Sequence, residues 1–578
     1  MVAATVFVAC CALGMAHLYE AHPAEDAFIL FKYADNVAHG HGAVYSVGGP
    51  RTEGATDFLW LVLLAASVAA GADVAAAAVV WNALGAAVAA VLVDQEIARS
   101  GVGRRWRLLL LAVPLSLPFV AGAPAAYLGF SSLVYQAMVL ATFAITVDGR
   151  FGPAVPWLGL LLTLFRPDGA FFAGAFVAVA GVSALRARRW RSFVSSTVAT
   201  VAVGVAYLLG RFAYFGLPLP LPLYVKSHGV IHGSLADRIL EYVPWLKGIA
   251  MQFMWLKSPI GPTAMAAALA LVLLLPPAPG PATRDRLRRA FVAGFGSLFF
   301  LGALSFAFQV QNVFFRYQAP VTLLLLFVLG GIAARRIAEA DSVLLRTITY
   351  LTVLAALAPG VVGGLRSIVD SARGRSYIDV LPARLAAVLP PGRTIALTDA
   401  GRLAYWTDER TIDVAGLNYA PTALRPPSVE LLRELDPDVL LIHPGAAVMG
   451  ETFPPASGTA PYRELEPAEI ERRISPLFRP IYEHGLADYR TTSNTATVAA
   501  VVMLRYLVER GDQYAIESVR YQGGYRHVFA FRRSLPEAGA IRAALGESTS
   551  GRGYAAYAAL KGFPFASPFD TRVDGSEQ

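Results

Sequence analysis

Residues 74–93 read VAAAAVVWNALGAAVAAVLV, a stretch that contains no charged side chain. A helix rises 1.5 Å per residue, so this stretch is long enough to cross the roughly 30 Å hydrocarbon core of a bilayer. It therefore predicts a membrane-spanning helix. Further charge-free runs of spanning or nearly spanning length lie at 1–19, 108–147, 151–165, 169–185, 192–210, 259–278, 291–315, 317–334 and 347–365.

The composition of the whole chain points to the same class. Of its 578 residues, 56% are hydrophobic and only 16% are charged, where a soluble globular chain carries about 25% charged residues. These values exclude a disordered, a fibrous or an ordinary cytosolic protein. The formal charge of +8 comes largely from short arginine clusters between apolar runs, so we expect no nucleic-acid partner. Cys10 and Cys11 are adjacent within an apolar run and are expected to be buried thiols.

The arginine clusters orient the chain. Basic groups at 104–107, 186–191, 284–289 and 335–346 are expected to face the cytoplasm. If Phe58–Ala72 crossed the bilayer, the first cluster would lie outside, so we interpret this run as a juxtamembrane helix at the outer interface. The 108–147 run is divided into two spans by prolines and a glycine. This gives about eleven spans, a cytoplasmic amino terminus that is not a cleaved signal peptide, and an outer carboxy terminus.

Two regions of different composition follow from this map. Residues 1–365 form a transmembrane domain with a first outer loop at 20–73, which includes juxtamembrane helices, and a second large outer loop at 211–258. From residue 366 to 578 the composition is that of a globular protein. Short apolar runs there predict an extracytoplasmic α/β domain. Its expected strands are Thr394–Leu397, Thr411–Val414 and Val439–Ile442, with a helix at Ser428–Leu435 between them.

An acidic pair, Glu25 and Asp26, follows the first span closely. Adjacent side chains on a helix point about 100° apart, so one carboxylate can face a cavity while the other is held elsewhere. Placing polar groups at the edge of the membrane costs free energy, so the polar groups that a chain keeps there are candidates for a functional site.

The pair opens a series of motifs: FxxxKYADNVxxGxG at 28–42, GGPRTEG at 48–54, TDFLW at 56–60, RPDG at 166–169, RFAYFGLPLPLPLYVKSHG at 211–229, FFRYQAP at 314–320 and ALTDAGRLAYWTDERTIDVAGL at 396–417. Their order through the whole chain resembles the GT-C superfamily of polyprenyl-phosphate-sugar-dependent glycosyltransferases. Within it, the nearest pattern is that of the AftB-like terminal β-(1→2) arabinofuranosyltransferases of mycobacteria and their relatives. The resemblance implies a GT-C fold and a bacterial inner-membrane enzyme.

The resemblance also implies roles for residues. The catalytic base is Asp26 or Glu25, since an acceptor hydroxyl that attacks an anomeric carbon must lose its proton. The lipid phosphate needs cations, and the candidates are Arg166, Lys226 and Arg316, which lie at the outer ends of spans or in outer loops. The candidate ligands for sugar or acceptor hydroxyls are Glu53, Asp168, Tyr33, Asn36 and His228.

The expected reaction is a single displacement with inversion, because the motifs offer no dedicated second carboxylate for a covalent intermediate. The donor is a polyprenyl-phosphate sugar, with arabinofuranose as one candidate, and the acceptor is an envelope glycan on the outer face. We expect no cofactor and no metal, because neither His39 and His41 nor His228 and His232 belong to an HExxH pattern. No pattern for nucleotide binding is present.

Other interpretations stay open. The acidic pair also suits a solvated helix start, and the cations suit interfacial anchors. A flippase or transporter for lipid-linked sugars would place ionisable residues along a midplane pathway, and a non-catalytic envelope assembly factor would not need Asp26. The carboxy-terminal domain is either an acceptor-binding module or a packing unit. Its polar residues suit both sugar binding and turns, and they are Asp399, Tyr405, Asp413 and Asn418.

Overall fold

The structure is a computed structural model, and it describes most of the chain. The ranges outside the description are 21–22, 121, 150–151, 228–289, 291–292, 295–315, 317–318, 374–376, 408–409, 450–461, 488–494, 521–525 and 550–578.

The described chain is helical up to residue 373. Among the residues that the structure describes, five helices are long and apolar enough to cross a membrane, and the shorter apolar helices include α1, α8 and α9. This confirms a polytopic helical membrane protein, without fixing the number of spans. The helices of this part are α1 (Val2–Glu20), α2 (Glu25–Ala38), α3 (Phe58–Ala69), α4 (Val74–Ala98), α8 (Ser132–Asp148), α9 (Ala154–Phe165), α10 (Gly169–Arg186), α11 (Trp190–Phe215), α12 (Leu221–Ser227), α17 (Ala319–Glu339) and α18 (Val343–Arg373).

The 108–147 run differs from the expected pair of continuous spans. Its second half is α8, but its first half is divided among α5 (Arg104–Leu110), α6 (Ala112–Leu115) and α7 (Ala123–Tyr127). Gly122, with φ of 82°, directly precedes α7, a conformation that glycine adopts without a steric penalty. The prolines and this glycine thus break the helix repeatedly instead of at one turn. The expected span at 259–278 lies outside the described residues, and so does the one at 291–315 except for residues 293–294.

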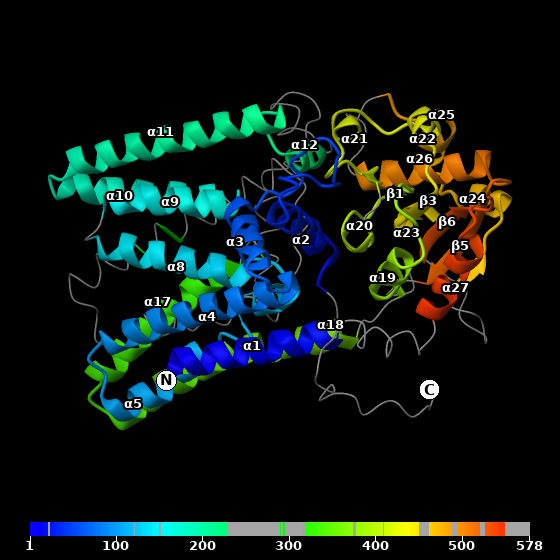
Figure 1. Cartoon of the computed structure of the whole chain (residues 1–578). Helices are drawn as coiled ribbons and strands as arrows, with labels where there is room; N and C mark the ends of the chain where they lie inside the picture. Colours follow the sequence, from blue (N-terminus) through cyan, green and yellow to red (C-terminus); the bar gives the residue numbers. More distant parts are fainter. Residues whose placement is uncertain are drawn as a thin grey trace, which may run out of the picture.

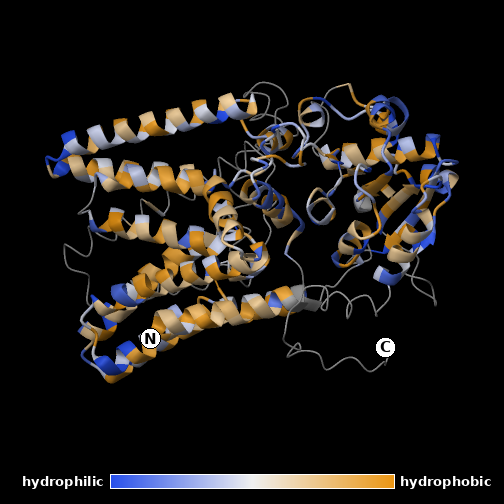
Figure 2. Ribbon diagram, in the orientation of Figure 1, coloured by the Kyte–Doolittle hydropathy of each residue, from blue (hydrophilic) through white to orange (hydrophobic). Residues whose placement is uncertain are grey.

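The long helices run roughly side by side, with the basic segments at one end of the bundle. In Figure 1, α5, the α10–α11 turn and the α17–α18 turn lie at the left, together with the amino terminus. Hydropathy colouring shows polar residues concentrated at this end and apolar residues along the helices (Figure 2). The β-sheet lies at the opposite end. This is the arrangement expected if the arginine clusters face the cytoplasm.

Helices α2 and α3 lie between the bundle and the sheet (Figure 1). The two pack against each other, and α3 also contacts α4 and α9. In Figure 1, α3 runs across the direction of the long helices, as expected for a juxtamembrane helix. Most side chains of α2 are buried, including Phe28, Phe31 and Lys32, because the helix is covered on both sides.

The carboxy-terminal part is an α/β domain with a six-stranded sheet of order β2-β1-β3-β6-β5-β4. Strands β1, β2 and β3 pair in parallel, and the other pairs are antiparallel. The predicted strands and helix of this domain match β1, β2, β3 and α22 within one residue. The bounds are β1 (Thr394–Leu397), β2 (Arg410–Asp413), α22 (Val429–Leu435), β3 (Val439–Ile442), β4 (Tyr462–Glu464), β5 (Tyr514–Arg520) and β6 (Arg526–Arg532).

Helices cover both faces of this sheet. Ala396 of β1 belongs to a core that includes α26 (Thr495–Glu509), whereas its neighbours Ile395 and Leu397 pack with residues of α19 (Leu381–Ala386) and α27 (Ala538–Thr549). This alternation follows from the two-residue period of a strand. The remaining helical segments are η3 (Tyr377–Asp379), α20 (Arg402–Trp406), α21 (Ala420–Leu424), α23 (Gly445–Met449), α24 (Pro467–Arg473) and α25 (Arg479–His484).

Candidate functional site

The acidic pair lies in the first turn of α2, and its two side chains go to different partners. Asp26 Oδ2 lies 3.9 Å from Arg316 Nη2, and the Asp26 side chain is 36% exposed. Glu25 turns toward the α/β domain, where its Oε1 accepts hydrogen bonds from the backbone N–H groups of Gly401 (2.6 Å) and Arg402 (2.9 Å). Adjacent positions on a helix allow such a divergence, but the sequence did not indicate which carboxylate would take which direction. Of the two carboxylates, Asp26 is therefore the one that a ligand can reach.

Glu25 is part of a polar network. Arg402 donates a hydrogen bond to Asp379 at 2.7 Å and another to the Pro23 carbonyl at 3.2 Å, and its Nε lies 3.6 Å from Glu25 Oε2. Burial raises the pKa of Glu25, whereas the Arg402 charge and the two backbone donors act against this rise. These contacts attach the start of α2 to the α/β domain. Glu25 therefore has a structural role.

Arg316 and Asp57 contact neighbouring residues of the turn that precedes α8. The guanidinium of Arg316 lies 4.4 Å from the centre of the Phe130 ring, a cation–π contact that orients it. The hydroxyl of the next residue, Ser131, donates a hydrogen bond of 3.2 Å to Asp57 Oδ2. The turn before α8 thus links the Asp26–Arg316 pair to a further carboxylate. Asp57 belongs to the TDFLW motif but was not among the predicted site residues.

Arg166 and Asp168 form a buried two-pronged ion pair. The Nε and Nη2 atoms of Arg166 donate to the two Asp168 oxygens at 3.0 and 3.2 Å. The Arg166 guanidinium also lies 4.6 Å from the Tyr135 ring centre, and the Tyr135 hydroxyl is 3.4 Å from Asp168. Burial raises the pKa of the Asp168 carboxyl, Arg166 opposes this, and the Asp57 charge reinforces it. The Asp57 charge therefore acts on the carboxyl of the Arg166–Asp168 pair.

Three other predicted site residues hold the first outer loop in shape. The Tyr33 hydroxyl donates to the Thr52 carbonyl at 2.8 Å and accepts from Gly54 N–H at 3.0 Å. Asn36 donates to the Val44 carbonyl at 2.8 Å. Glu53 forms a buried ion pair with Arg211. Their roles as sugar ligands stay predictions. His228 lies outside the described residues; Lys226 lies on α12, and its side chain is not described.

The first outer loop is bonded at many points to the α/β domain. Lys32 donates to the Ala404 carbonyl and lies 3.3 Å from Thr411 Oγ1. The Tyr45 hydroxyl donates to the Ala400 carbonyl at 2.6 Å. These partners are separated by more than 350 positions in sequence, so nothing in the local pattern could have revealed the contacts.

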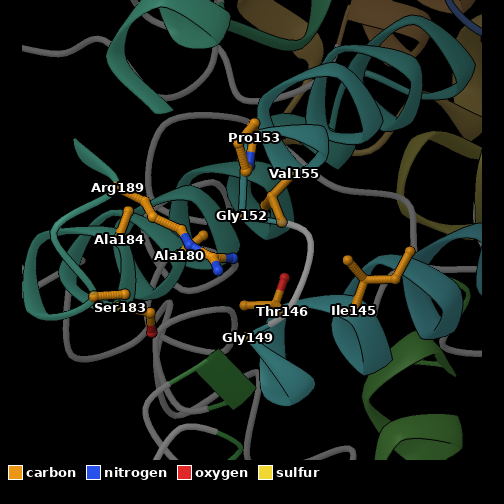
Figure 3. A pocket seen from close by; sticks show the side chains of 11 residues that line it. Ile145, Thr146, Gly149, Gly152, Pro153, Val155, Ala180, Ser183, Ala184 and Arg189 are labelled. Atoms are coloured by element: carbon orange, nitrogen blue, oxygen red, sulfur yellow. The ribbon is translucent and has the colours of Figure 1, made fainter. Parts of the chain in front are cut away.

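A small cavity lies at the opposite, basic end of the bundle, between α8, α9 and α10 (Figure 3). Thr146, Ser183 and Arg189 are among its lining residues. Its volume of about 30 Å³ holds roughly one water molecule. It is too small for a sugar, and it lies away from the acidic pair.

Comparison with known proteins gives one family model, one curated relative and several solved structures. Residues 374–533 match a domain family of unknown function, DUF8728. ArnT from Cupriavidus metallidurans bound to undecaprenyl phosphate is 12% identical, with 91% of this chain and 98% of that chain covered at a TM-score of 0.48. The Archaeoglobus fulgidus oligosaccharyltransferase complex with Zn and sulfate is 13% identical, with coverages of 77% and 68% and a TM-score of 0.40.

The curated relative is the terminal β-(1→2)-arabinofuranosyltransferase of Mycobacterium tuberculosis, which is 28% identical over 257 residues. The match covers 39% of this chain, and the chain spans only 38% of the relative's length. This similarity confirms the resemblance that the motifs indicated: the chain is similar in sequence to the AftB-like arabinofuranosyltransferases.

Proposed function

We propose that the protein is an inverting glycosyltransferase of the GT-C type, which transfers a sugar from a polyprenyl-phosphate donor to an envelope glycan on the outer face of the membrane. The observation that carries the proposal is the Asp26–Arg316 pair. Asp26 lies in the first turn of α2, the helix between the bundle and the α/β domain (Figure 1). A carboxylate and a guanidinium side by side supply a proton acceptor and a phosphate ligand at the edge of the bilayer, where a lipid-linked donor presents its sugar.

In this reaction the acceptor hydroxyl oxygen attacks the anomeric carbon while the bond from that carbon to the phosphate oxygen breaks. The Asp26 carboxylate takes the hydroxyl proton. The polyprenyl phosphate leaves as a weakly basic anion and needs no general acid. One displacement at one carbon inverts its configuration.

Arg316 is suited to the departing phosphate. Its contact with Asp26 is long, at 3.9 Å, so an incoming phosphate has room to compete for the guanidinium. Stacking on Phe130 holds the group in place without using its N–H donors. The charge that develops on the leaving oxygen then meets a cation that is already oriented. Arg166 is engaged with Asp168, so we assign it a second, supporting role.

Similarity to an arabinofuranosyltransferase makes arabinofuranose the first sugar to test. The experiment uses the full-length protein in detergent, a set of synthetic polyprenyl-phosphate sugars that includes arabinofuranose, and an envelope-glycan acceptor. We expect transfer by the wild type and at least a 100-fold loss in Asp26→Asn, since general base catalysis contributes about 10²–10⁴-fold.

The neighbouring Glu25→Gln is the matched control. An amide oxygen still accepts from the two backbone N–H groups, so this variant should keep most of its activity. Equal losses in both variants would contradict the assignment of Asp26 as the base. Absence of transfer with every donor, together with movement of labelled lipid across proteoliposomes, would favour the flippase instead.

A further inference from the structure

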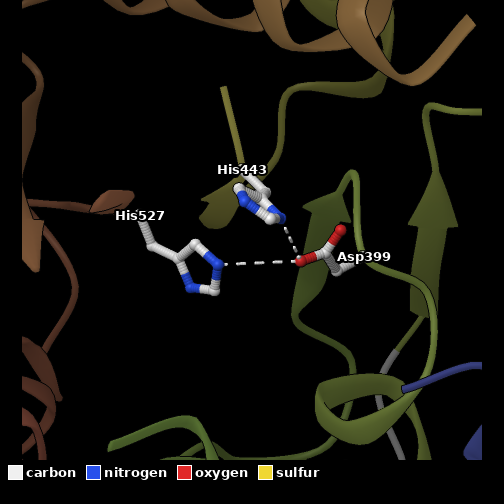
Figure 4. A group of neighbouring side chains, drawn as sticks. All are labelled: Asp399, His443 and His527. Carbon is white, nitrogen blue, oxygen red and sulfur yellow. Dashed lines mark hydrogen bonds and ion pairs between the residues drawn. The ribbon is translucent and has the colours of Figure 1, made fainter. Parts of the chain in front are cut away.

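Three side chains that are distant in sequence converge in the α/β domain. Asp399, His443 and His527 each offer an oxygen or nitrogen atom, and these atoms lie within 4.8 Å of one another. Figure 4 shows both imidazoles turned toward the same carboxylate oxygen of Asp399. Among the residues that the structure describes, this group alone combines three such side chains in metal-binding range.

The order of strands brings the group together. Asp399 follows β1 by two residues, and His443 directly follows β3, which pairs in parallel with β1. Strand β6 runs antiparallel to β3, with Val528 opposite Ile442, so His527 lies beside the end of β3. Three adjacent strands therefore deliver one residue each to the same edge of the sheet. The sequence spacing alone predicts no metal site, because the ligands meet only through this topology.

One histidine, His443, is within hydrogen-bond distance of Asp399, whereas the other, His527, lies beyond it. His443 Nδ1 lies 3.2 Å and His527 Nε2 lies 3.7 Å from the same oxygen, Asp399 Oδ2. The longer distance exceeds the range of a hydrogen bond. In a tetrahedral site with bonds near 2.0–2.1 Å, neighbouring ligand atoms lie about 3.3 Å apart. The two measured distances bracket that spacing.

The surroundings also fit a bound metal. The Tyr377 hydroxyl lies 2.6 Å from His527 Nδ1, so the other ring nitrogen of His527 is the one that faces Asp399. A metal-binding histidine commonly uses its second nitrogen in this way, which fixes the ring orientation. His527 is 1% exposed, whereas His443 and Asp399 are 31% and 28% exposed. The group is thus anchored in the core and accessible from one side.

We propose that Asp399, His443 and His527 bind one divalent transition-metal ion of the zinc type, with a coordination position left for water. Imidazole and carboxylate ligands without a thiolate are suited to such ions. The ion cross-links β1, β3 and β6 at the edge that faces α2. Gly401 and Arg402, which hold Glu25, follow Asp399 in the chain, so the metal stiffens the attachment of the first outer loop.

The test measures zinc in the purified full-length protein by elemental mass spectrometry, after chelation and reloading with Zn²⁺. We expect one zinc per chain in the wild type and less than about 0.1 in His443→Ala. His484→Ala is the matched control, because His484 is an exposed histidine of the same domain; it should bind as the wild type does. Co²⁺ loading should give the visible absorption of a four-coordinate site in the wild type and the control only.

Tyr377→Phe tests the proposal independently, in case His443→Ala does not fold. It removes one hydroxyl and keeps the ring, and the expected loss in zinc affinity is about 10- to 100-fold. A wild type that takes up no zinc or cobalt, or equal metal content in His443→Ala and His484→Ala, would overturn the proposal and leave a hydrogen-bonded network. These measurements need no sugar transfer, so their outcome is independent of the proposed activity.

Discussion

Glu53 and Arg211 form an ion pair with only 9% and 6% of their side chains exposed. The pair joins the first outer loop to the end of α11, and Arg211 also donates to the Pro218 carbonyl at 2.8 Å. Removal of one partner from a buried pair leaves an uncompensated charge, at a cost of about 3–5 kcal/mol. We therefore expect Arg211→Met to lower the melting temperature of the detergent-solubilised protein, and Glu53→Gln combined with Arg211→Met to restore much of it.

The Arg211→Met variant should also depend on pH. Burial raises the pKa of Glu53, and Arg211 opposes this rise. Without the guanidinium, the folded-state pKa of this carboxyl rises further above its unfolded value, so the folded state binds the proton more tightly. Stability must then fall as pH increases from the unfolded-state pKa of a glutamate, about 4.3, through the raised folded-state pKa. A melting temperature of the variant that stays constant over this range, relative to the wild type, would contradict the buried pair.

At the scale of elements, α2 and α20 meet so closely that Gly401 leaves no room for a side chain. A methyl group there would overlap the carbonyl oxygen of Glu25. Overpacking of this kind costs about 1–3 kcal/mol, so we expect Gly401→Ala to loosen the contact, with faster hydrogen exchange in α2 and slower sugar transfer. Gly539→Ala is the control, because open space surrounds that glycine. Unchanged exchange in α2 of Gly401→Ala would argue against the contact.

Local patterns predict the elements well, and they fail where distant segments meet. Apolar runs of three and four residues bounded by polar residues were enough to locate β1 and β3, because central strands are buried on both faces. The acidic pair was located by its place after the first span. Its division of labour was not predictable, because Glu25 and Gly401 are 376 positions apart. The breaks between α5, α6 and α7 were underestimated, since several prolines and glycines act together there.

At the scale of the whole molecule, the proposed reaction requires the α/β domain and the acidic pair to lie on the side of the membrane where the lipid-linked sugar is presented. The basic segments lie at the opposite end of the bundle (Figure 1), and positively charged loops remain in the cytoplasm. Single cysteines test this orientation in a background that carries Cys10→Ala and Cys11→Ala. Leu477 of the α/β domain is 74% exposed, and Arg186 is exposed at the basic end of α10.

We expect a membrane-impermeant maleimide to label Leu477→Cys in right-side-out vesicles and Arg186→Cys only after the membrane is opened. Inside-out vesicles should give the reverse pattern, which controls for differences in thiol reactivity. Labelling of Arg186→Cys in sealed right-side-out vesicles would show that the orientation is the opposite of the one expected, with Asp26 at the cytoplasmic face. The acceptor would then have to be a cytoplasmic molecule instead of an envelope glycan, even if Asp26 remained the base.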